Sequence, residues 1–408
     1  MGGGLLQLVA CGAQDAFLTG NPQITFWRGL YKRHTNFAME PFRVNLTGQA
    51  AWGTKHSAVL GRHADLISSA YVEVELGNEE SNLCYDFQSN GKQGFNLLEY
   101  AELDIGGQII DRQYGEFMYI WSQLAYSIDE RSKLRAMALT KLDTNASCTT
   151  ITGRPTRKNL TYIPLMFFFC RNPGAALPLI ALQYHEVKIN ILWNKAKLIF
   201  QSNAGGSITS TGPAQANLLV DYIYLDVEER RRMAQESHEY LIEQTQFNED
   251  KGLTSAQNRV DLTFNHPVKE LIWVTQPTAY KNCRLVGHQI SPLDYTDIIY
   301  DCSLQLNGQD RVPSLPGRYY EVVQPFQHHS GTVLDGVYMY SFAIKPEEHQ
   351  PSGTCNFSRI DTATLVFNVD GAVPISIEDK NNYDIRVYAI NYNILRVMSG
   401  MGGLAYSN

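Results

Sequence analysis

The chain has 408 residues and a mass of 46.0 kDa, which is enough for two or three domains of ordinary size. Charged residues make up 18% of the chain, aromatic residues 11%, and the formal net charge is -7 at pH 7. This balance excludes a disordered chain, and a pI near 5.8 argues against duplex DNA as the main partner, because phosphates attract a basic field. The composition therefore predicts an ordered globular protein with a large core.

Most of the chain reads as short runs of alternating apolar and polar residues separated by turn residues, the pattern of sandwiches and barrels. In residues 70–76, 187–191 and 385–389, apolar side chains at every second position predict antiparallel strands with one buried face. Three pairs that tolerate positive φ predict tight hairpins: Asn307-Gly308, Asp335-Gly336 and Asp370-Gly371.

Helical periodicity is concentrated between Tyr114 and about Leu142, where apolar residues recur at three- and four-residue spacing. Ser127 followed by Glu130 forms a capping box that opens a second short helix within this region. The charged run Glu228–Gln235 predicts a short helix that links two domains. Its three arginines have nucleic-acid contact as an alternative role, but the neighbouring glutamates largely cancel their charge.

Three landmarks recur in the same order in the two halves of the chain, with offsets of roughly 170 to 200 residues, the size of one sandwich domain. The paired segments are Leu103–Gln108 with Leu304–Gln309, Asp65–Ile67 with Lys269–Ile272, and Pro164–Phe169 with Val337–Phe342. This ordered repetition predicts two similar all-β domains in tandem.

Motif searches return no catalytic or metal site, so we expect no cofactor and no enzyme activity. His185 and His238 each precede a glutamate, as in zinc-protease helices, but isoleucine stands where the second histidine belongs. His328-His329 lacks the further ligands of a metal cluster, and we interpret both residues as ordinary loop histidines. Phosphate-binding, dinucleotide-binding and nucleophile-elbow motifs are also missing.

The seven cysteines are widely spaced and form no Cys-x-x-Cys pair, which excludes a disulfide framework and a zinc ribbon. Residues 1–15 lack a basic region and a long apolar run, so we expect neither conventional secretion nor a membrane-spanning segment. A chain without a signal peptide does not ordinarily meet the glycosylation machinery. The candidate glycosylation sites, each an Asn-x-Ser/Thr sequon, are Asn45, Asn145, Asn159 and Asn356.

Long ordered stretches across nearly the whole chain resemble the major capsid protein of nucleocytoplasmic large DNA viruses, the group that infects algae and amoebae. These stretches are Leu6–Ala10, Gly12–Asp15, Leu18–Phe26, Arg33–Ala38, Ala181–Val187, His238–Gln244, Leu306–Arg311, Gln350–Asp361 and Met398–Tyr406. Ordered strings of this length are far more specific than a short motif.

The resemblance implies an all-β fold of two tandem eight-stranded jelly-roll sandwiches, a double jelly-roll, with short helical insertions. By analogy, residues 1–20 form an N-terminal arm, 21–226 the first jelly-roll domain, 227–236 a linker, 237–400 the second jelly-roll domain, and 401–408 a C-terminal tail. Three chains would form a homotrimer with a pseudo-hexagonal outline, the building block of an icosahedral capsid.

The resemblance also implies the partners: neighbouring capsomers, minor capsid and penton proteins, and an internal viral membrane near the base of the trimer, where the glycine-rich chain ends would lie. No direct sequence-specific binding of nucleic acid is expected. The protein would be assembled in cytoplasmic virus factories of the host cell and would reside in the outer capsid shell of the virion.

Two other functions stay open on the residues alone. A jelly-roll carbohydrate-binding module for host attachment would group aromatic side chains on an exposed loop. A β-sandwich hydrolase would assemble its active site from residues distant in sequence. The aromatic residues Trp27, Tyr31 and Trp52 would either dock the N-terminal arm or fill a core.

Overall fold

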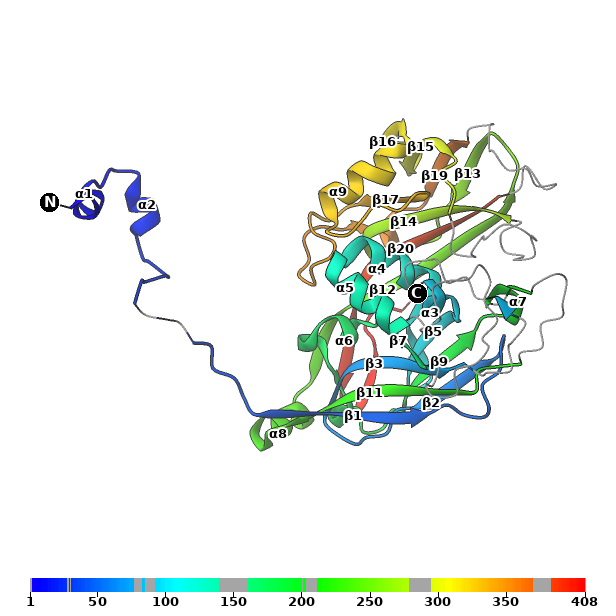
Figure 1. The fold of residues 1–408 in the computed structure, drawn as a ribbon, viewed down its shortest axis with the longest axis horizontal. Helices are drawn as coiled ribbons and strands as arrows, with labels where there is room; N and C mark the ends of the chain where they lie inside the picture. The colour runs from blue at the N-terminus through cyan, green and yellow to red at the C-terminus, as the bar shows by residue number, and fades with distance from the viewer. Residues whose placement is uncertain are drawn as a thin grey trace. The chain divides into compact units, whose positions relative to one another are not determined.

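The computed structural model describes residues 2–27, 29, 31–76, 83–84, 92–138, 160–199, 201–202, 211–278, 295–369 and 383–407. The chain divides into two compact units, Met1–Phe37 and Ala38–Asn408. The first unit contains α1 (Gly3–Val9) and α2 (Asp15–Thr19), and neither helix has a buried residue. All the sheets belong to the second unit (Figure 1).

The first sandwich of the second unit is built from two antiparallel sheets. One has the strand order β1-β11-β3-β7, with β8 beside β3, and the other has the order β2-β9-β5-β6. The strands are β1 (Phe37–Asn45), β2 (Lys55–Val59), β3 (Leu66–Glu75), β5 (Leu98–Ile105), β6 (Gln108–Tyr114), β7 (Leu160–Pro164), β8 (Leu177–Pro178), β9 (Val187–Trp193) and β11 (Gln215–Leu225); β4 (Leu83–Cys84) and β10 (Gln201–Ser202) form a separate ribbon.

The second sandwich repeats this plan. Its sheets have the orders β12-β20-β14-β17, with β18 beside β14 and β21 beside β20, and β13-β19-β15-β16. The strands are β12 (His238–Leu253), β13 (Gln257–Asp261), β14 (Pro267–Pro277), β15 (Ile299–Leu306), β16 (Gln309–Pro316), β17 (Val337–Ser341), β18 (Cys355–Asn356), β19 (Ala363–Val369), β20 (Tyr383–Met398) and β21 (Met401–Leu404).

When the strands of the two sandwiches are matched in chain order, both sheet orders coincide: β1 matches β12, β3 matches β14, β11 matches β20, and so on through all eight pairs. Eight antiparallel strands that alternate between two packed sheets form a jelly-roll. The molecule is therefore a double jelly-roll, and the predicted all-β fold class is confirmed.

The predicted repeat is confirmed at its turns. Gly106 and Gly107 have positive φ between β5 and β6, and Asn307 and Gly308 have positive φ between β15 and β16. The predicted hairpin at Asp335-Gly336 is wrong, because the residues before it form a helix and a loop rather than a strand. The pair Asp370-Gly371 lies outside the described residues.

Helices cover the ends and the junction of the sandwiches. The predicted helical region is confirmed as two helices, and its capping box is present: the Ser127 backbone N–H donates to Glu130 Oε2 at 2.9 Å. No helix among the described residues combines the length and apolar character needed to cross a bilayer. The helices of the second unit are α3 (Lys92–Asn96), α4 (Gly115–Ala125), α5 (Ile128–Ala138), α6 (Phe168–Arg171), α7 (Ala196–Ile199), α8 (Val227–Gln235) and α9 (Gln324–His328), with short helical turns η1 (Pro173–Ala175), η2 (Leu179–Ala181), η5 (Tyr319–Val323) and η6 (Phe357–Arg359).

Strand β20 departs from the prediction of a half-buried strand. Ile385 and Val387 face the core of the second sandwich, as expected, but Arg386 and Tyr388 on the opposite face are buried as well. The reason is that the first sandwich covers that face: Tyr388 belongs to the same apolar cluster as the core of the first sandwich. The strand is therefore shared between two cores.

Candidate functional site

The two sandwiches meet along a seam between α4 and the β12-β20-β14-β17 sheet (Figure 1). Helix α4 starts at Gly115, where a Cβ atom would lie 2.2 Å from the Leu98 carbonyl oxygen, so a side chain has no room there. The helix then presents Phe117 to Tyr388, with ring centroids 5.4 Å apart. Buried aromatic contacts of this kind join the sandwiches through a large apolar area.

A buried ion pair crosses the same seam. Arg386 donates from Nε and Nη2 to the two carboxylate oxygens of Glu116 on α4, at 2.6 and 2.5 Å. The Tyr388 hydroxyl donates to the same carboxylate at 2.5 Å, and Arg386 also donates to Gln276 Oε1 at 3.0 Å. Burial alone would lower the pKa of the Arg386 guanidinium, but Glu116 raises it, so the pair stays charged. This bidentate geometry fixes the relative orientation of the guanidinium and the carboxylate as well as the distance between them.

A second charged group at the seam contains a fully buried lysine. Lys269 Nζ donates to Glu243 Oε1 at 2.6 Å and to the Pro346 carbonyl oxygen at 2.7 Å. Arg171 of α6, in the first sandwich, donates to the other oxygen of Glu243 at 2.9 Å. Burial lowers the pKa of Lys269, whereas the two cations hold the pKa of Glu243 below its usual range against its own burial. The Glu243 carboxylate therefore binds a basic side chain from each of the two sandwiches.

His329 is the third charged group, and its interpretation as an ordinary loop histidine is wrong. Its side chain is only 1% exposed and bridges Glu270 Oε1 at 2.9 Å and Glu347 Oε1 at 3.0 Å. The ring stands edge-on to Trp121 of α4 at 5.7 Å. Burial would lower the pKa of His329, but the two carboxylates raise it to about 9. The ring is therefore a cation at neutral pH.

The glycine-rich segment after β20 also lies at the seam. A tight turn at Ser399 and Gly400, both with positive φ, folds β21 back onto β20. His185 Nδ1 of the first sandwich lies 2.9 Å from the Gly402 carbonyl oxygen, and the Leu404 N–H donates to Gln108 Oε1 at 3.3 Å. Residues 401–404 are thus a paired strand that bridges both sandwiches.

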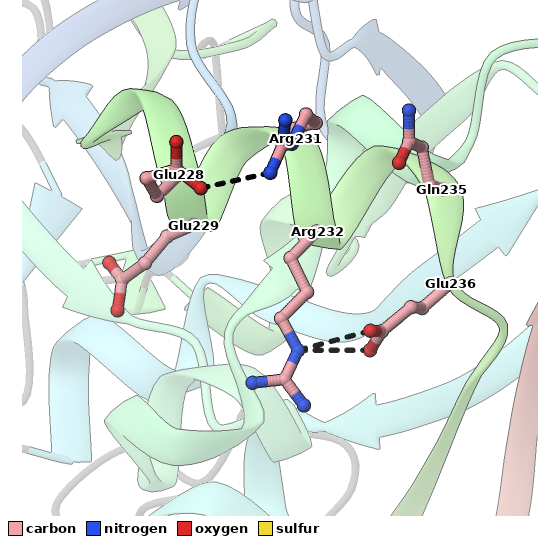
Figure 2. A pocket seen from close by; sticks show the side chains of 6 residues that line it. All are labelled: Glu228, Glu229, Arg231, Arg232, Gln235 and Glu236. Atoms are coloured by element: carbon pink, nitrogen blue, oxygen red, sulfur yellow. Dashed lines mark hydrogen bonds and ion pairs between the residues drawn. The ribbon is translucent and has the colours of Figure 1, made fainter.

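Arg231 and Arg232 of α8 line an open hollow of about 410 Å³ (Figure 2). Each arginine has a carboxylate partner in the chain: Arg230 with Asp65 at 3.0 Å, Arg231 with Glu228 at 3.0 Å, and Arg232 with Glu236 at 3.1 Å. The predicted linker helix is confirmed as a helix. Its charges are internally paired, so the run presents no excess of positive charge to a phosphate backbone.

The N-terminal unit exposes large apolar side chains. Phe26, Trp27 and Tyr31 are exposed by 107%, 83% and 93%. Trp52, in the second unit, instead packs edge-on against Trp193 at 5.9 Å. Of the three aromatic residues with two predicted roles, Trp52 therefore packs against the body, whereas Trp27 and Tyr31 are free of any core within their own unit.

The candidate glycosylation sites fall into two groups. Asn45, at the end of β1, and Asn356, at the end of β18, are exposed. Asn356 Oδ1 accepts the Ser358 N–H at 3.1 Å, so its side chain already serves the turn that follows. Asn145 and Asn159 lie outside the described residues.

The two histidines that precede glutamates do not lie on a helix of the kind that holds zinc in proteases. His185 lies in a loop, and His238 is the first residue of β12, so neither is on a helix. Among the described residues, no group of three or more His, Cys, Asp or Glu side chains is placed to hold a metal ion.

Sequence reasoning missed all three charged groups of the seam, because each pairs residues far apart in the chain. A local signal was present in two places. Lys269-Glu270 and Arg386 interrupt apolar strands, and a charge inside such a strand needs a partner when both faces are buried.

Comparison with known proteins decides the family. A model of the large eukaryotic DNA virus major capsid protein matches residues 229–403, and a model of the major capsid protein N-terminus matches residues 25–226. The chain belongs to the major capsid proteins of large eukaryotic DNA viruses. The boundary between the two matches falls at the start of α8.

Individual relatives agree with the family models. The major capsid protein of Pyramimonas orientalis virus is 44% identical over 432 residues, covering 100% of both chains. The crystal structure of PBCV-1 VP54 aligns with a TM-score of 0.78 and 34% identity, covering 94% of this chain and 100% of that one. A chain of the PBCV-1 virus capsid aligns with a TM-score of 0.76 and 35% identity, with the same coverage. As a major capsid protein, the chain has a structural function in the shell of the virion.

Proposed function

We propose that three copies of this chain close into a homotrimer with a pseudo-hexagonal outline, and that these trimers tile an icosahedral shell. The observation that supports this most directly is the duplication: two sandwiches with the same strand order are held together by a buried seam. Three copies then supply six similar sandwiches around one threefold axis. Closure by threefold rotation requires one face of a subunit to meet a different face of its neighbour.

The domain plan of this subunit is an N-terminal arm over residues 1–20, jelly-roll domains over 21–226 and 237–400, a linker over 227–236 and a tail over 401–408. The two sandwiches, which end at β11 and begin again at β12 on either side of helix α8, support the two jelly-roll domains and the linker. The arm docks on other proteins of the shell, because its apolar side chains have no core within their own unit.

Neighbouring capsomers, minor capsid proteins and penton proteins are the expected partners, with the base of the trimer near an internal viral membrane. The protein acts without catalysis or cofactor and without sequence-specific binding of nucleic acid, and it assembles in cytoplasmic virus factories. Asn45, Asn145, Asn159 and Asn356 remain candidate glycan sites. Capsomer contacts that are weak singly become strong collectively in a closed shell.

Light scattering on the purified chain, combined with negative-stain images of the same peak, tests the trimer. We expect a particle of about 138 kDa, three times 46.0 kDa, with a hexagonal outline. A folded 46.0 kDa monomer at micromolar concentration would contradict the proposal. The carbohydrate-binding module would then become the leading function, with a glycan array as the next measurement.

A further inference from the structure

The two sandwiches carry equivalent helices at their edges. Helix α4 follows β6 and starts at Gly115, where a Cβ atom would lie 2.2 Å from the Leu98 carbonyl oxygen. The continuous helix η5–α9 follows β16 and starts at Gly317, where a Cβ atom would lie 2.0 Å from the Ile299 carbonyl oxygen. Leu98 and Ile299 are the first residues of the matching strands β5 and β15. The two helices therefore leave their sandwiches in the same way.

The faces of these helices differ in burial. In α4, Trp121 and Leu124 are exposed by only 5% and 1%, because the second sandwich covers them. At the same numbers of residues after the starting glycine, η5–α9 carries Val323 and Phe326, with the π-helical turn Tyr319–Val323 changing their direction relative to Trp121 and Leu124. Val323 is exposed by 38% and Phe326 by 86%. The second helix thus has an apolar face that the chain itself does not cover.

The sheets that would receive these helices are also equivalent. In the second sandwich, Ile272 pairs across the sheet with Tyr388 and Met339, and all three are exposed by 1% or less beneath the first sandwich. In the first sandwich, the equivalent residue Tyr71 pairs with Leu219 and Pro164, and these three are only half-buried. The outer face of the β1-β11-β3-β7 sheet therefore lacks the full cover that its counterpart has.

The charge at the helix start is reversed between the two halves of the chain. Glu116, next to the first starting glycine, pairs with Arg386 on the sheet at 2.5 Å. The residue next to the second starting glycine is Arg318, which is exposed. On the outer face of the first sandwich, Asn217 takes the place of Arg386, and its cross-strand neighbour is Glu73, whose carboxylate already pairs with Arg43 of β1 at 3.0 Å. The Glu116–Arg386 ion pair of the intrachain seam thus has no counterpart at this position.

We propose that the Val323–Phe326 face of helix η5–α9 packs against the outer face of the β1-β11-β3-β7 sheet of a second copy of this chain. The contact repeats between chains the apolar seam that α4 forms within the chain. It is heterologous, as ring closure requires, and it rests on the proposed trimer. The same docking plan would then be used at all six junctions between sandwiches.

The test measures native mass at a concentration where the wild type is a trimer. Phe326→Asp is expected to abolish the trimer peak without changing the fold, because the side chain is 86% exposed. Leu219→Asp is expected to do the same from the receiving side, with Leu219→Ser as the milder variant if melting shows a folding defect. Tyr300→Ser is the matched control: Tyr300 is 69% exposed, and its equivalent Glu99 stays exposed beside the intrachain seam.

Mixing the two disabled chains distinguishes this contact from other interfaces. The Phe326→Asp chain keeps an intact sheet face, and the Leu219→Asp chain keeps an intact helix, so the mixture is expected to form a one-to-one dimer of about 92 kDa, twice 46.0 kDa. If the wild type is a trimer and both folded variants remain trimers, this inference is overturned while the proposed trimer stands. A monomeric wild type overturns both.

Discussion

Lys269 is fully buried at the seam, where Lys269 and Arg171 share the carboxylate of Glu243. We expect Glu243→Gln to lower the free energy of unfolding by about 3–5 kcal/mol, because it removes the carboxylate partner that Lys269 and Arg171 share. Urea unfolding at pH 7 measures the loss.

The matched control for that substitution is Glu239→Gln on the same strand. Glu239 pairs with Arg396, but the two side chains are 56% and 50% exposed. Exposed ion pairs contribute about 0–1 kcal/mol, so the control is expected to unfold nearly as the wild type does. Equal losses in both variants would show that the seam pair has no special role.

The raised pKa of His329 predicts that the folded protein loses stability at alkaline pH. Its folded-state pKa is raised to about 9 by Glu270 and Glu347, above the value of about 6.5 expected when unfolded. A raised pKa means that the protonated ring stabilises the folded state. That contribution, about 3 kcal/mol, is complete below about pH 6.5 and is lost as the pH rises through about 9.

Melting temperatures between pH 6 and pH 10 check this. The difference between the wild type and His329→Gln is expected to be large at pH 6 and to shrink toward pH 10. His328→Gln is the neighbouring control, since His328 Nδ1 lies 3.1 Å from the Ile344 carbonyl oxygen rather than against a carboxylate, and it is expected to follow the wild type. A difference that stays constant with pH would refute the role of the charge.

At the scale of elements, the starting glycines of the two edge helices are the most constrained positions. We expect Gly115→Ala and Gly317→Ala each to destabilise the protein by about 1–3 kcal/mol, because the new Cβ atom would collide with a carbonyl oxygen of the neighbouring strand. Gly403→Ala is the control, because its Cβ would meet only the movable end of Gln108. The same Tm for all three variants in thermal unfolding would contradict a collision at Gly115 and Gly317.

The elements themselves were predictable because their signals are local. The alternation in residues 70–76 and 187–191, the capping box at Ser127 and the turn at Asn307-Gly308 each depend on a few neighbouring residues. The arrangement of these elements as a double jelly-roll was predicted from the family resemblance.

Local sequence signals did not predict that β20 is buried on both faces. The partner of Arg386 is Glu116, 270 positions away, and a strand with a polar residue at every second position reads as half-exposed until that partner is known. His329 was misread for the same reason, since Glu270 reaches it from a distant strand. The seam was therefore hidden from the sequence, although its charged residues stood inside apolar strands.

At the scale of the whole molecule, the N-terminal unit is expected to be dispensable for folding. No described residue of Met1–Phe37 is buried, so deletion of residues 1–36 should leave the Tm of the double jelly-roll unchanged in calorimetry at equal concentration. Because the arm is proposed to dock on other shell proteins, the truncated chain should form trimers but fail to assemble further. A Tm lowered by several degrees would contradict this separation.

The seam also has a consequence for synthesis. Tyr388 follows Glu116 by 272 positions, and ribosomes add roughly 5–20 residues per second, so α4 waits roughly tens of seconds for the strand that covers it. Throughout that interval the nascent first sandwich displays Phe117 and Trp121 to the cytosol. On crowded polysomes, many growing chains expose this face at once. The time for which the uncovered helix is exposed therefore depends on the speed of translation.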